Sequence, residues 1–426
     1  MRFKIIVSLF VAATMAVGAQ AQLTLGKCVR LAQENYPLIA KYELLERTSA
    51  VELSDINKSW LPQIGVSGRA TVQNAVPSYP DVLKNVMEQM GTSVPGLEKL
   101  QYKVGVDLNQ TVWDGGASKS QRSVVRASEA ERRAALDVQL YAIRERVENL
   151  YFGILLYDEQ TEQIRSMKSL LESNHQRVRS MKEHGVAMQS DVDIIEAQLL
   201  TTSQQLTQAA DEAQTLRRQL GLFIGREAGE LARPDASMPT DMTVKRPELG
   251  LYAARISTND ARRAEIKASL MPRIGVFAQA NYGYPGFDSF KSMMSRDLTF
   301  NVMAGVSVTW NIGSFYTRAN RGRRLSLASA EAEADRDVFL FNSDMQVRSQ
   351  TERIEELRRV MADDARIVEL RGAVRKAAES QLDNGVIDSF ALLSKITEEN
   401  QARLAATYHE IQLLQAICQL KYTVNQ

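Results

Sequence analysis

Cysteine and histidine are scarce in this chain of 426 residues, which contains two cysteines and three histidines. Cys28 and Cys418 are too few to form the disulfide framework on which small secreted domains depend. Each lies on an apolar helical face, so we expect two buried free thiols, with a disulfide as the alternative. His175, His184 and His409 are scattered and lack the spacing of metal ligands. The sequence therefore predicts neither a metal site nor a cofactor.

The chain also lacks an excess of charge of one sign and, after its first residues, any long hydrophobic run. Its 52 basic and 51 acidic residues give a formal net charge of +1. A nucleic-acid partner demands a basic surface, so this balance argues against one. No apolar stretch beyond the N-terminus reaches the roughly 20 residues that a membrane-spanning helix needs. We therefore expect no transmembrane helix, and the absence of a catalytic motif predicts that the protein is not an enzyme.

The first 21 residues have the order of a secretory signal peptide. Arg2 and Lys4 precede an apolar run that ends at about Val17, and AQA at residues 19–21 supplies a small-residue cleavage site. A short membrane anchor is the alternative, but the apolar run is shorter than a spanning helix. We therefore expect residues 1–21 to be removed and the mature chain to leave the cytoplasm.

Four stretches alternate apolar and polar residues with a period of two. They cover about residues 62–74, 101–113, 272–284 and 297–312. This period predicts strands with one apolar and one polar face, each near the 9–11 residues of a tilted membrane strand. Pro62 and Pro272 stand at the start of two strands, where a missing N–H does not disturb the ladder. A soluble β-sandwich is the alternative, but helical patterns rather than further strands surround these stretches.

The helical patterns are heptad repeats. One apolar position recurs every seven residues over residues 136–178, and the series restarts over residues 192–220. Residues 340–368 keep the same spacing in the second half of the chain. Sustained heptads predict left-handed coiled coils that are far longer than a globular helix. At 1.5 Å per residue, residues 116–182 would reach about 100 Å, which is enough to cross a compartment.

The two halves of the chain repeat each other. SWLPQIGVSG at residues 59–68 is echoed by SLMPRIGVFA at residues 269–278, and Gly185 and Gly385 stand 200 residues apart in similar sequences. Each half contains a helix, two strands and a long helical hairpin, so we interpret the chain as a tandem duplication. The first repeat spans residues 22–235 with its hairpin at 116–225, and the second spans residues 236–426 with its hairpin at 314–424.

The ordered motifs resemble those of the outer membrane efflux protein family typified by TolC. The resemblance rests on LTLGKCVRLAQENYPLI, LPQIGVSG, LNQTVWDGG, ENLYFGIL, RRQLGLFIG and the two glycine-centred turns, and it runs from about Leu23 to Tyr422. It implies an α+β membrane protein, a homotrimer with one shared 12-stranded β-barrel that a periplasmic α-helical barrel continues. Four strands cannot close alone, because open edges find no hydrogen bonds in lipid and natural barrels have at least eight strands.

Polar residues in and after the strands are candidates for two surfaces. Arg69, Lys103, Asp107, Gln279 and Asn281 lie on the polar strand faces and would line a water-filled pore. RANRGRR at residues 318–324 follows the last strand. It could bind anionic lipid or solute, with a solvated helix start as the alternative.

The two glycine-centred turns are the candidate docking site. The resemblance implies that they form the periplasmic tip, where the tunnel narrows and an adaptor protein docks. The docking residues would then be His184, Gly185, Val186, Asn384, Gly385 and Val386, and the candidates for the aperture are Ser190, Asp191, Asp388 and Ser389. Glycine suits a tight reversal because it tolerates a positive φ. The alternative is that these are only turns, with docking spread over the neighbouring helices.

The resemblance also implies a function, location and partners. It points to a passive outer-membrane channel of a tripartite system that exports small molecules such as drugs and toxic compounds. The partners would be two further copies of the chain, a periplasmic adaptor (membrane fusion protein), an inner-membrane pump of the resistance-nodulation-division or ABC type, and outer-membrane lipid. One alternative is the outer-membrane conduit of a type I protein secretion system. Another is a coiled-coil periplasmic scaffold without a pore.

Overall fold

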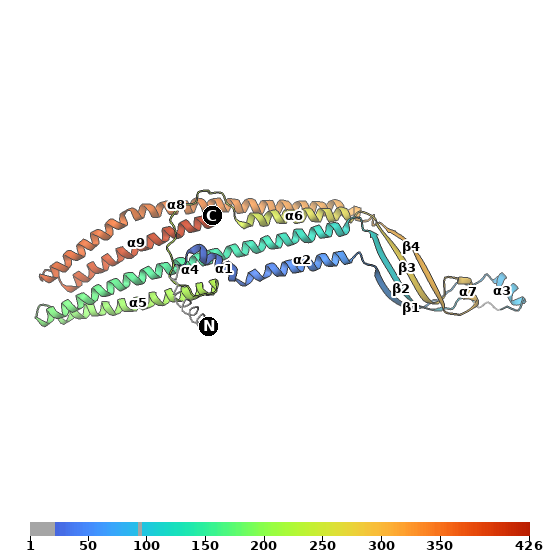
Figure 1. The fold of residues 1–426 in the computed structure, drawn as a ribbon, viewed down its shortest axis with the longest axis horizontal. Helices are drawn as coiled ribbons and strands as arrows, with labels where there is room; N and C mark the ends of the chain where they lie inside the picture. The colour runs from blue at the N-terminus through green and yellow to red at the C-terminus, as the bar shows by residue number, and fades with distance from the viewer. Residues whose placement is uncertain (1–21, 93–95) are drawn as a thin grey trace, which may run out of the picture. The chain divides into compact units, whose positions relative to one another are not determined.

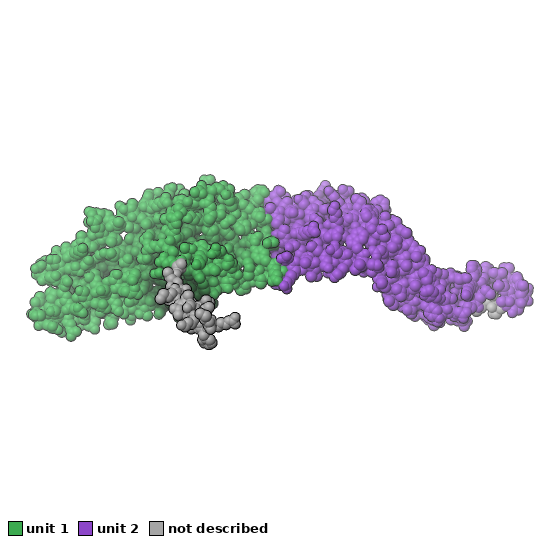
Figure 2. Space-filling view, in the orientation of Figure 1, with its two compact units in different colours: residues 1–43, 133–251, 334–426 green, residues 44–132, 252–333 purple. Residues whose placement is uncertain are grey.

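The computed structural model describes residues 22–92 and 96–426, so the predicted signal peptide lies outside the described residues. The chain is predominantly helical with one small antiparallel sheet, as the sequence predicts. It divides into two compact units, which Figure 2 colours separately. Unit 1 contains the described residues up to Glu43 together with Arg133–Leu251 and Ala334–Gln426. Unit 2 contains Leu44–Arg132 and Tyr252–Glu333.

Unit 2 contains a four-stranded antiparallel sheet in which the strands follow the order β1-β2-β3-β4 (Figure 1). The strands are β1 (Gln63–Val72), β2 (Leu100–Trp113), β3 (Arg273–Tyr284) and β4 (Thr299–Thr309). The two outer strands, β1 and β4, pair on one side only among the described residues. The sheet therefore has two open edges.

The sheet is a single layer with both faces exposed. Successive side chains of a strand point to opposite faces, and directly paired residues share a face. Val66, Val106, Ala280 and Val302 form one row across all four strands. None of the described helices covers this apolar face (Figure 1), and Val66 keeps 77% of its surface exposed. The alternation in the sequence therefore produces a sheet with an apolar face that the described chain does not bury.

The two ends of the sheet differ in what they connect to. Four helices meet one end: α2 (Ala40–Lys58), α4 (Ala117–Glu183), α6 (Pro247–Ala268) and α8 (Ser314–Asp383). Two short helices lie at the other end (Figure 1), namely α3 (Asp81–Gln89) and α7 (Ser289–Met294). There Tyr79, Leu97, Tyr284 and Met293 form a small core, and the Tyr284 hydroxyl donates to the Ser292 carbonyl at 3.0 Å. At this end of the sheet, the segments that connect the strands therefore pack against one another.

Unit 1 contains most of two helical hairpins, whose first helices begin in unit 2. The first joins α4 to α5 (Gln189–Ile224), and the second joins α8 to α9 (Ser389–Val424). Near the turns the hairpins share one apolar core, whose buried members are Met167, Leu171, Val178, Val192, Ile195, Ala378, Leu382, Leu392 and Ile396. None of the described helices is both long enough and apolar enough to cross a membrane.

A second core of unit 1 contains both cysteines. It packs α1 (Leu25–Asn35), which the short helix η1 (Pro37–Ile39) follows, against α4, α5 and α9. Cys28 and Cys418 are both buried in this core and are free thiols, as the sequence predicts. Burial raises the pKa of the Cys418 thiol to about 11. A thiol with so high a pKa is protonated at neutral pH and unreactive.

Candidate functional site

The polar face of the sheet contains all five residues that the sequence assigns to a pore lining. Arg69 pairs with Lys103, and Asp107 pairs with Gln279. Asn281 lies two residues beyond Gln279, opposite Asn301, whose side-chain amide donates to the Asn281 Oδ1 at 3.3 Å. The register places these side chains on one face, because paired residues share a face and alternate residues return to it. The sheet thus combines a polar face with an apolar one.

One aromatic residue interrupts the polar face and was missed from the sequence. Phe277 pairs with Asn109 on one side and with Gly305 on the other. A Cβ atom on Gly305 would lie 2.9 Å from the Phe277 ring, so the ring extends over the glycine. Met303 stands two residues from Gly305 on the same face and is 42% exposed. The alternation could have revealed this apolar patch, because Phe277 falls between Val276 and Ala278 of the other face.

The first hairpin reverses at Gly185, which has a φ of +78°. The Gly185 N–H donates to the Lys182 carbonyl at 2.9 Å, and the Val186 N–H donates to the Met181 carbonyl at 2.8 Å. This pair of bonds is the Schellman motif, which satisfies the last carbonyls of a helix and places a left-handed residue after it. His184 is exposed, and its Nδ1 lies 2.8 Å from the Ser180 carbonyl oxygen.

The second hairpin reverses in the same way at Gly385, which has a φ of +69°. Its N–H donates to the Leu382 carbonyl at 2.9 Å, and the Val386 N–H donates to the Gln381 carbonyl at 2.8 Å. Asn384 is exposed at the position before the glycine, and its side-chain amide donates to the Ser380 carbonyl at 2.7 Å. The six residues assigned to docking therefore form two turns of matching geometry.

The four residues assigned to the aperture occupy the starts of α5 and α9. Asp191 accepts a hydrogen bond from the Met188 N–H at 2.9 Å, and Asp388 accepts one from the Ala391 N–H at 2.8 Å. Both carboxylates therefore cap helix N-termini, where they satisfy free N–H groups and favour the helix dipole. Ser190 is exposed, whereas Ser389 keeps only 2% of its surface exposed.

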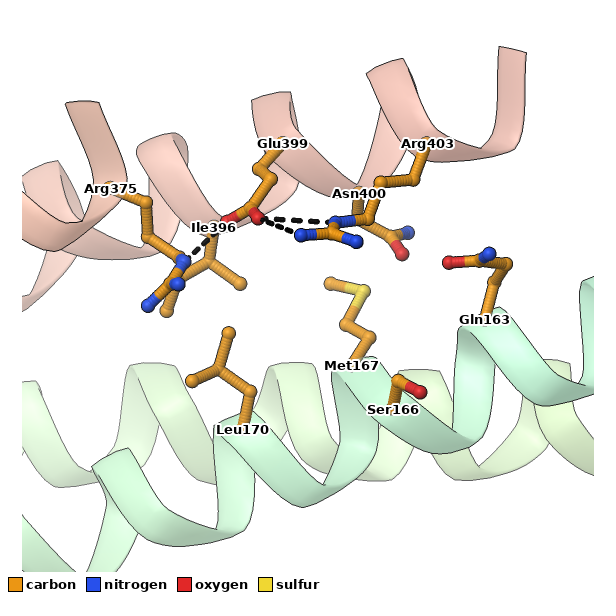
Figure 3. A pocket seen from close by; sticks show the side chains of 9 residues that line it. All are labelled: Gln163, Ser166, Met167, Leu170, Arg375, Ile396, Glu399, Asn400 and Arg403. Carbon is orange, nitrogen blue, oxygen red and sulfur yellow. Dashed lines mark hydrogen bonds and ion pairs between the residues drawn. The ribbon is translucent and has the colours of Figure 1, made fainter. Parts of the chain in front are cut away.

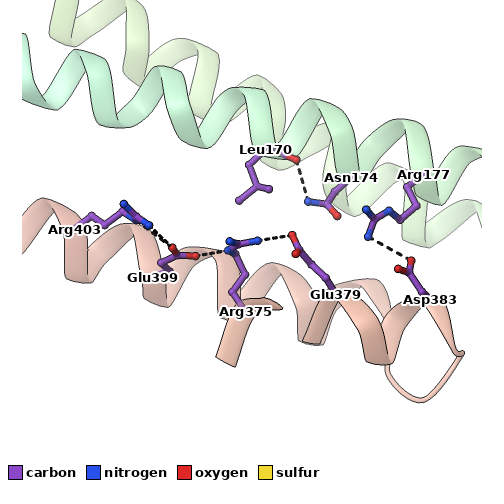
Figure 4. A network of polar contacts seen from close by, with 8 residues as sticks. All are labelled: Leu170, Asn174, Arg177, Arg375, Glu379, Asp383, Glu399 and Arg403. Atoms are coloured by element: carbon purple, nitrogen blue, oxygen red, sulfur yellow. Dashed lines mark hydrogen bonds and ion pairs between the residues drawn. The ribbon is translucent and has the colours of Figure 1, made fainter. Parts of the chain in front are cut away.

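A cluster of charged residues lies inside the second hairpin and was not found from the sequence (Figure 4). The Glu399 cluster consists of Glu399, Arg375, Arg403 and Glu379. Glu399 is 5% exposed and accepts hydrogen bonds from Arg375 and from Arg403, the latter at 2.7 Å. Arg375 also bonds Glu379 at 2.6 Å. Two positive and two negative charges thus compensate one another between α8 and α9.

The surroundings of Glu399 change its acidity. Burial alone would raise its pKa, because the charged form loses contact with water. The hydrogen bonds from Arg403 and Arg375 outweigh burial, so the pKa of Glu399 lies below its usual value. The residue is therefore a carboxylate at neutral pH. A signal for it existed in the sequence, since Glu399 stands 200 residues after Leu199, an apolar heptad position of the first hairpin.

The Glu399 cluster borders a cavity of about 330 Å³ between the two hairpins (Figure 3). Met167 and Leu170 of α4 point toward α9 from the opposite side, and Ile396 lies on the α9 side beside Glu399. Closer to the turns, Arg177 of α4 forms an ion pair with Asp383 of α8 at 3.3 Å. Within residues 22–92 and 96–426, no group of three or more His, Cys, Asp or Glu side chains could hold a metal ion.

The chain is similar to several solved structures. No protein-family model matches it, and no curated protein matches it. The outer-membrane channel OprN is similar with a TM-score of 0.68 and 16% identity, over 94% of this chain and 89% of that chain. The outer membrane protein VceC from Vibrio cholerae has a TM-score of 0.68 and 11% identity, over 94% of this chain and 95% of that chain.

A third solved structure is the MtrE outer membrane channel of Neisseria gonorrhoeae in its open state. It has a TM-score of 0.65 and 13% identity, over 94% of this chain and 88% of that chain. At these identities the similarity establishes the fold. The chain has the fold of these outer-membrane channels, which confirms the predicted similarity to them and the predominantly helical chain with a small antiparallel sheet.

Proposed function

We propose that this chain, which has the fold of outer-membrane channels, is the passive outer-membrane channel of a tripartite system that exports small molecules. One observation carries the proposal: the sheet of unit 2 has an exposed apolar face, a polar face and, among the described residues, two open edges. A large exposed apolar surface marks a site of contact with lipid or with another protein. A bilayer around the sheet and water inside it would satisfy both faces.

The open edges require further copies of the chain. Lipid offers no hydrogen-bonding partner to the free N–H and C=O groups of β1 and β4, so a sheet in a membrane must close. Four strands are too few, since natural barrels have at least eight. We propose that β4 of one copy pairs with β1 of the next in a homotrimer with 12 strands. The barrel would lie in the outer membrane and the helices in the periplasm.

The polar face would line the water-filled lumen of this barrel. Arg69, Lys103, Asp107, Gln279 and Asn281 share that face, and their side chains are exposed or half-buried. Polar side chains of both signs lower the cost of moving water and polar solutes through the barrel. A passive conduit needs no catalytic group, so export would take its energy from a pump in the inner membrane.

The turns at Gly185 and Gly385 are the proposed docking site for a periplasmic adaptor. Both are exposed, and the added Cβ atom of either glycine would meet no atom within 4 Å. Their matching geometry is what the proposed tandem duplication predicts, since each repeat would supply one turn. The adaptor would connect these turns to an inner-membrane pump of the resistance-nodulation-division or ABC type.

Two neighbouring substitutions in β4 test which face of the sheet meets lipid. Val306 lies on the apolar face and is 69% exposed, and Ser307 lies on the other face of the same strand. Val306→Lys should reduce the yield of assembled protein, because a lysine facing lipid at mid-bilayer costs about 2–4 kcal/mol. Ser307→Lys, its matched control, should assemble normally. Equal assembly of the two variants would contradict the proposed orientation of the sheet.

The assembly and the activity need separate measurements. Native mass measurement in detergent should give a trimer, and planar-bilayer recording should give an open pore. A strain that lacks the chain should become sensitive to small toxic compounds. A strain that stays resistant but fails to secrete a protein would support type I secretion instead. A monomer that remains soluble without detergent would contradict the proposed channel and favour the coiled-coil scaffold.

A further inference from the structure

The first turns of α8 contain a concentrated group of arginines, which we call the arginine cluster: Arg318, Arg321, Arg323 and Arg324. No Asp or Glu occurs between Asp297 and Glu331, so this stretch has four positive charges and no negative one. Arg321 is half-buried, and the other three are exposed. Within the part of the chain that the structure describes, none of the four guanidinium groups has an ion-pair or hydrogen-bonding partner. The cluster is therefore available to bind a negative partner from outside the chain.

Exposed aromatic residues separate the arginine cluster from the sheet. Trp310 directly follows β4 and is 54% exposed, and its indole N–H donates to the Leu270 carbonyl at 2.9 Å. The Phe315 ring meets the Trp310 ring edge-on, with centroids 6.3 Å apart. Tyr316 is 84% exposed. Such exposure is unusual for large rings in water, whereas tryptophan and tyrosine are enriched where a bilayer meets water.

Along the chain, the apolar face of β4 is thus followed by aromatic rings and then by the arginine cluster. This order matches the depth profile of a bilayer, in which the hydrocarbon core is followed by the interface and then by phosphate groups. We infer that the arginine cluster binds the phosphate groups of anionic phospholipids in the leaflet that faces the helices. The inference rests on the proposed function, because it requires the sheet to lie in a bilayer.

The chemistry of arginine fits this ligand. A guanidinium group binds phosphate oxygens through two parallel hydrogen bonds and remains charged at every relevant pH. Anionic lipids also attract basic residues near the membrane surface over roughly one Debye length, about 8 Å at physiological salt.

The exit of the first strand pair is different, and it supports assigning the lipid site to α8. Asp114 follows β2 directly and uses its carboxylate as a cap, accepting from the Gly116 N–H at 2.9 Å and the Ser118 N–H at 2.6 Å. Arg122 of α4 donates to the Asn57 side chain at 2.8 Å. At this exit, one basic residue therefore has a hydrogen-bonding partner and an acidic residue stands nearby in the sequence. The arginine cluster of α8 has neither a partner among the described residues nor an acidic residue nearby in the sequence.

The test measures lipid binding to the full mature protein. The protein is purified in detergent, and native mass spectrometry records how much phosphatidylglycerol or phosphatidylcholine each trimer retains. The variant is Arg318→Gln/Arg323→Gln/Arg324→Gln. The matched control, Arg358→Gln/Arg359→Gln/Arg366→Gln, removes three exposed arginines from a distant part of the same helix. We expect the first variant to lose apparent affinity for phosphatidylglycerol on the order of tenfold or more, because each basic residue contributes severalfold near an anionic surface.

Three outcomes would overturn the inference. Equal retention of phosphatidylglycerol by the two variants would mean that the arginine cluster is a solvated helix start. Equal retention of phosphatidylcholine and phosphatidylglycerol by the unmodified protein would show no preference for anionic lipid. Displacement of the lipid by millimolar inorganic phosphate would identify a site for free anions. A protein that inserts into no vesicle of either lipid would instead refute the proposed function, so the two failures can be told apart.

Discussion

The first hairpin, α4 with α5, and the second, α8 with α9, reverse direction through the same backbone geometry. Gly185 and Gly385 have φ values of +78° and +69°. The two hydrogen bonds that end the outgoing helix have the same lengths in both hairpins, 2.9 and 2.8 Å. The residues behind these turns differ. Leu199 of α5 packs on the shared apolar core, whereas Glu399 of α9, 200 residues later, is buried in a charged cluster.

This comparison separates what a turn requires from what a helix interface requires. A Schellman turn needs a residue that accepts a positive φ, and glycine does so without strain, so both hairpins use it. The interface behind the turn needs side chains that can be buried without a large desolvation cost. A leucine meets this need because it is apolar, and a carboxylate meets it when it is fully hydrogen-bonded. A buried ion pair is a weak source of net stability, but its members depend on one another. The second hairpin should therefore tolerate single substitutions less well than the first.

The largest difference should follow removal of the carboxylate. Glu399→Ala leaves Arg375, whose side chain is 14% exposed, with Glu379 as its remaining partner. Breaking a buried ion pair costs about 3–5 kcal/mol, and the remaining partner should reduce this to about 2–4 kcal/mol. Leu199→Ala, at a half-buried site, should cost about 1–2 kcal/mol. Thermal unfolding in detergent measures both. Equal losses would mean that the two interfaces are energetically alike.

The alternation in the sequence was enough to predict the four strands and their faces, because a period of two leaves one face apolar wherever a strand forms. Val66, Val106 and Val306 share the apolar face, and Arg69 and Asp107 share the polar one. What closes the sheet could not be read from one chain. In the proposed trimer, the partner of each open edge would be a strand of another copy, and contacts between copies would set its register.

Comparison of the two repeats marks Glu399 as a departure from the apolar Leu199, but the heptad pattern of the second hairpin alone could not predict that Glu399 is buried. Heptad analysis assigns apolar residues to the core and charged residues to the surface, so it places Glu399 outside. The residue is buried because Arg375 and Arg403 are close enough to compensate it, and this proximity is a property of the folded helices. Asp191 and Asp388 were assigned to an aperture, and their capping bonds also depend on geometry that the sequence only suggests.

Replacing the turn glycines should have the next largest effect, and it should be the same in both hairpins. Gly185→Val and Gly385→Val force a β-branched residue to a positive φ, which costs about 1–3 kcal/mol. A Cβ atom at either glycine meets no atom within 4 Å, so we expect backbone strain to be the main cost. The double variant should still assemble but fail to export, because the proposed docking surface would be distorted. Normal export by a normally assembled double variant would show that these turns are not the coupling site.

Asparagine provides the control for these glycine variants. It adopts a positive φ more readily than valine, so Gly185→Asn and Gly385→Asn should keep most of the stability. Export by the asparagine variants would attribute the valine defect to backbone geometry. A clear difference between the two positions would contradict the equivalence of the turns.

Removing the helix caps should cost less stability than replacing the glycines, and the loss should be slightly larger in the second hairpin than in the first. Asp388 is the N-cap of α9, and Asp388→Ala should cost about 1 kcal/mol. Asp191 lies at the third position of α5 and bonds back to the Met188 N–H, so Asp191→Ala should cost about 0.5 kcal/mol. Hydrogen exchange of the first-turn amides of α5 and α9 measures each cap. Unchanged exchange at both sites would leave the carboxylates free for the predicted role at the aperture.

Lowering the pH should produce the smallest difference in stability between the two hairpins, over the pH range in which the protein stays folded. Because the pKa of Glu399 is lowered on folding, its contribution to stability is complete above its unfolded pKa of about 4.3 and is lost as pH falls through the lower folded value. Leu199 does not titrate. Hydrogen exchange between pH 6 and pH 3, corrected for intrinsic rates, should therefore show protection falling more around Glu399 in α9 than around Leu199 in α5. Glu399→Gln keeps the shape of the side chain and removes the titration, so it should abolish this difference. If the variant keeps the same acid sensitivity, other carboxylates of the second hairpin are responsible, with Glu379, which shares Arg375, and Glu398, the next residue in the chain, as candidates.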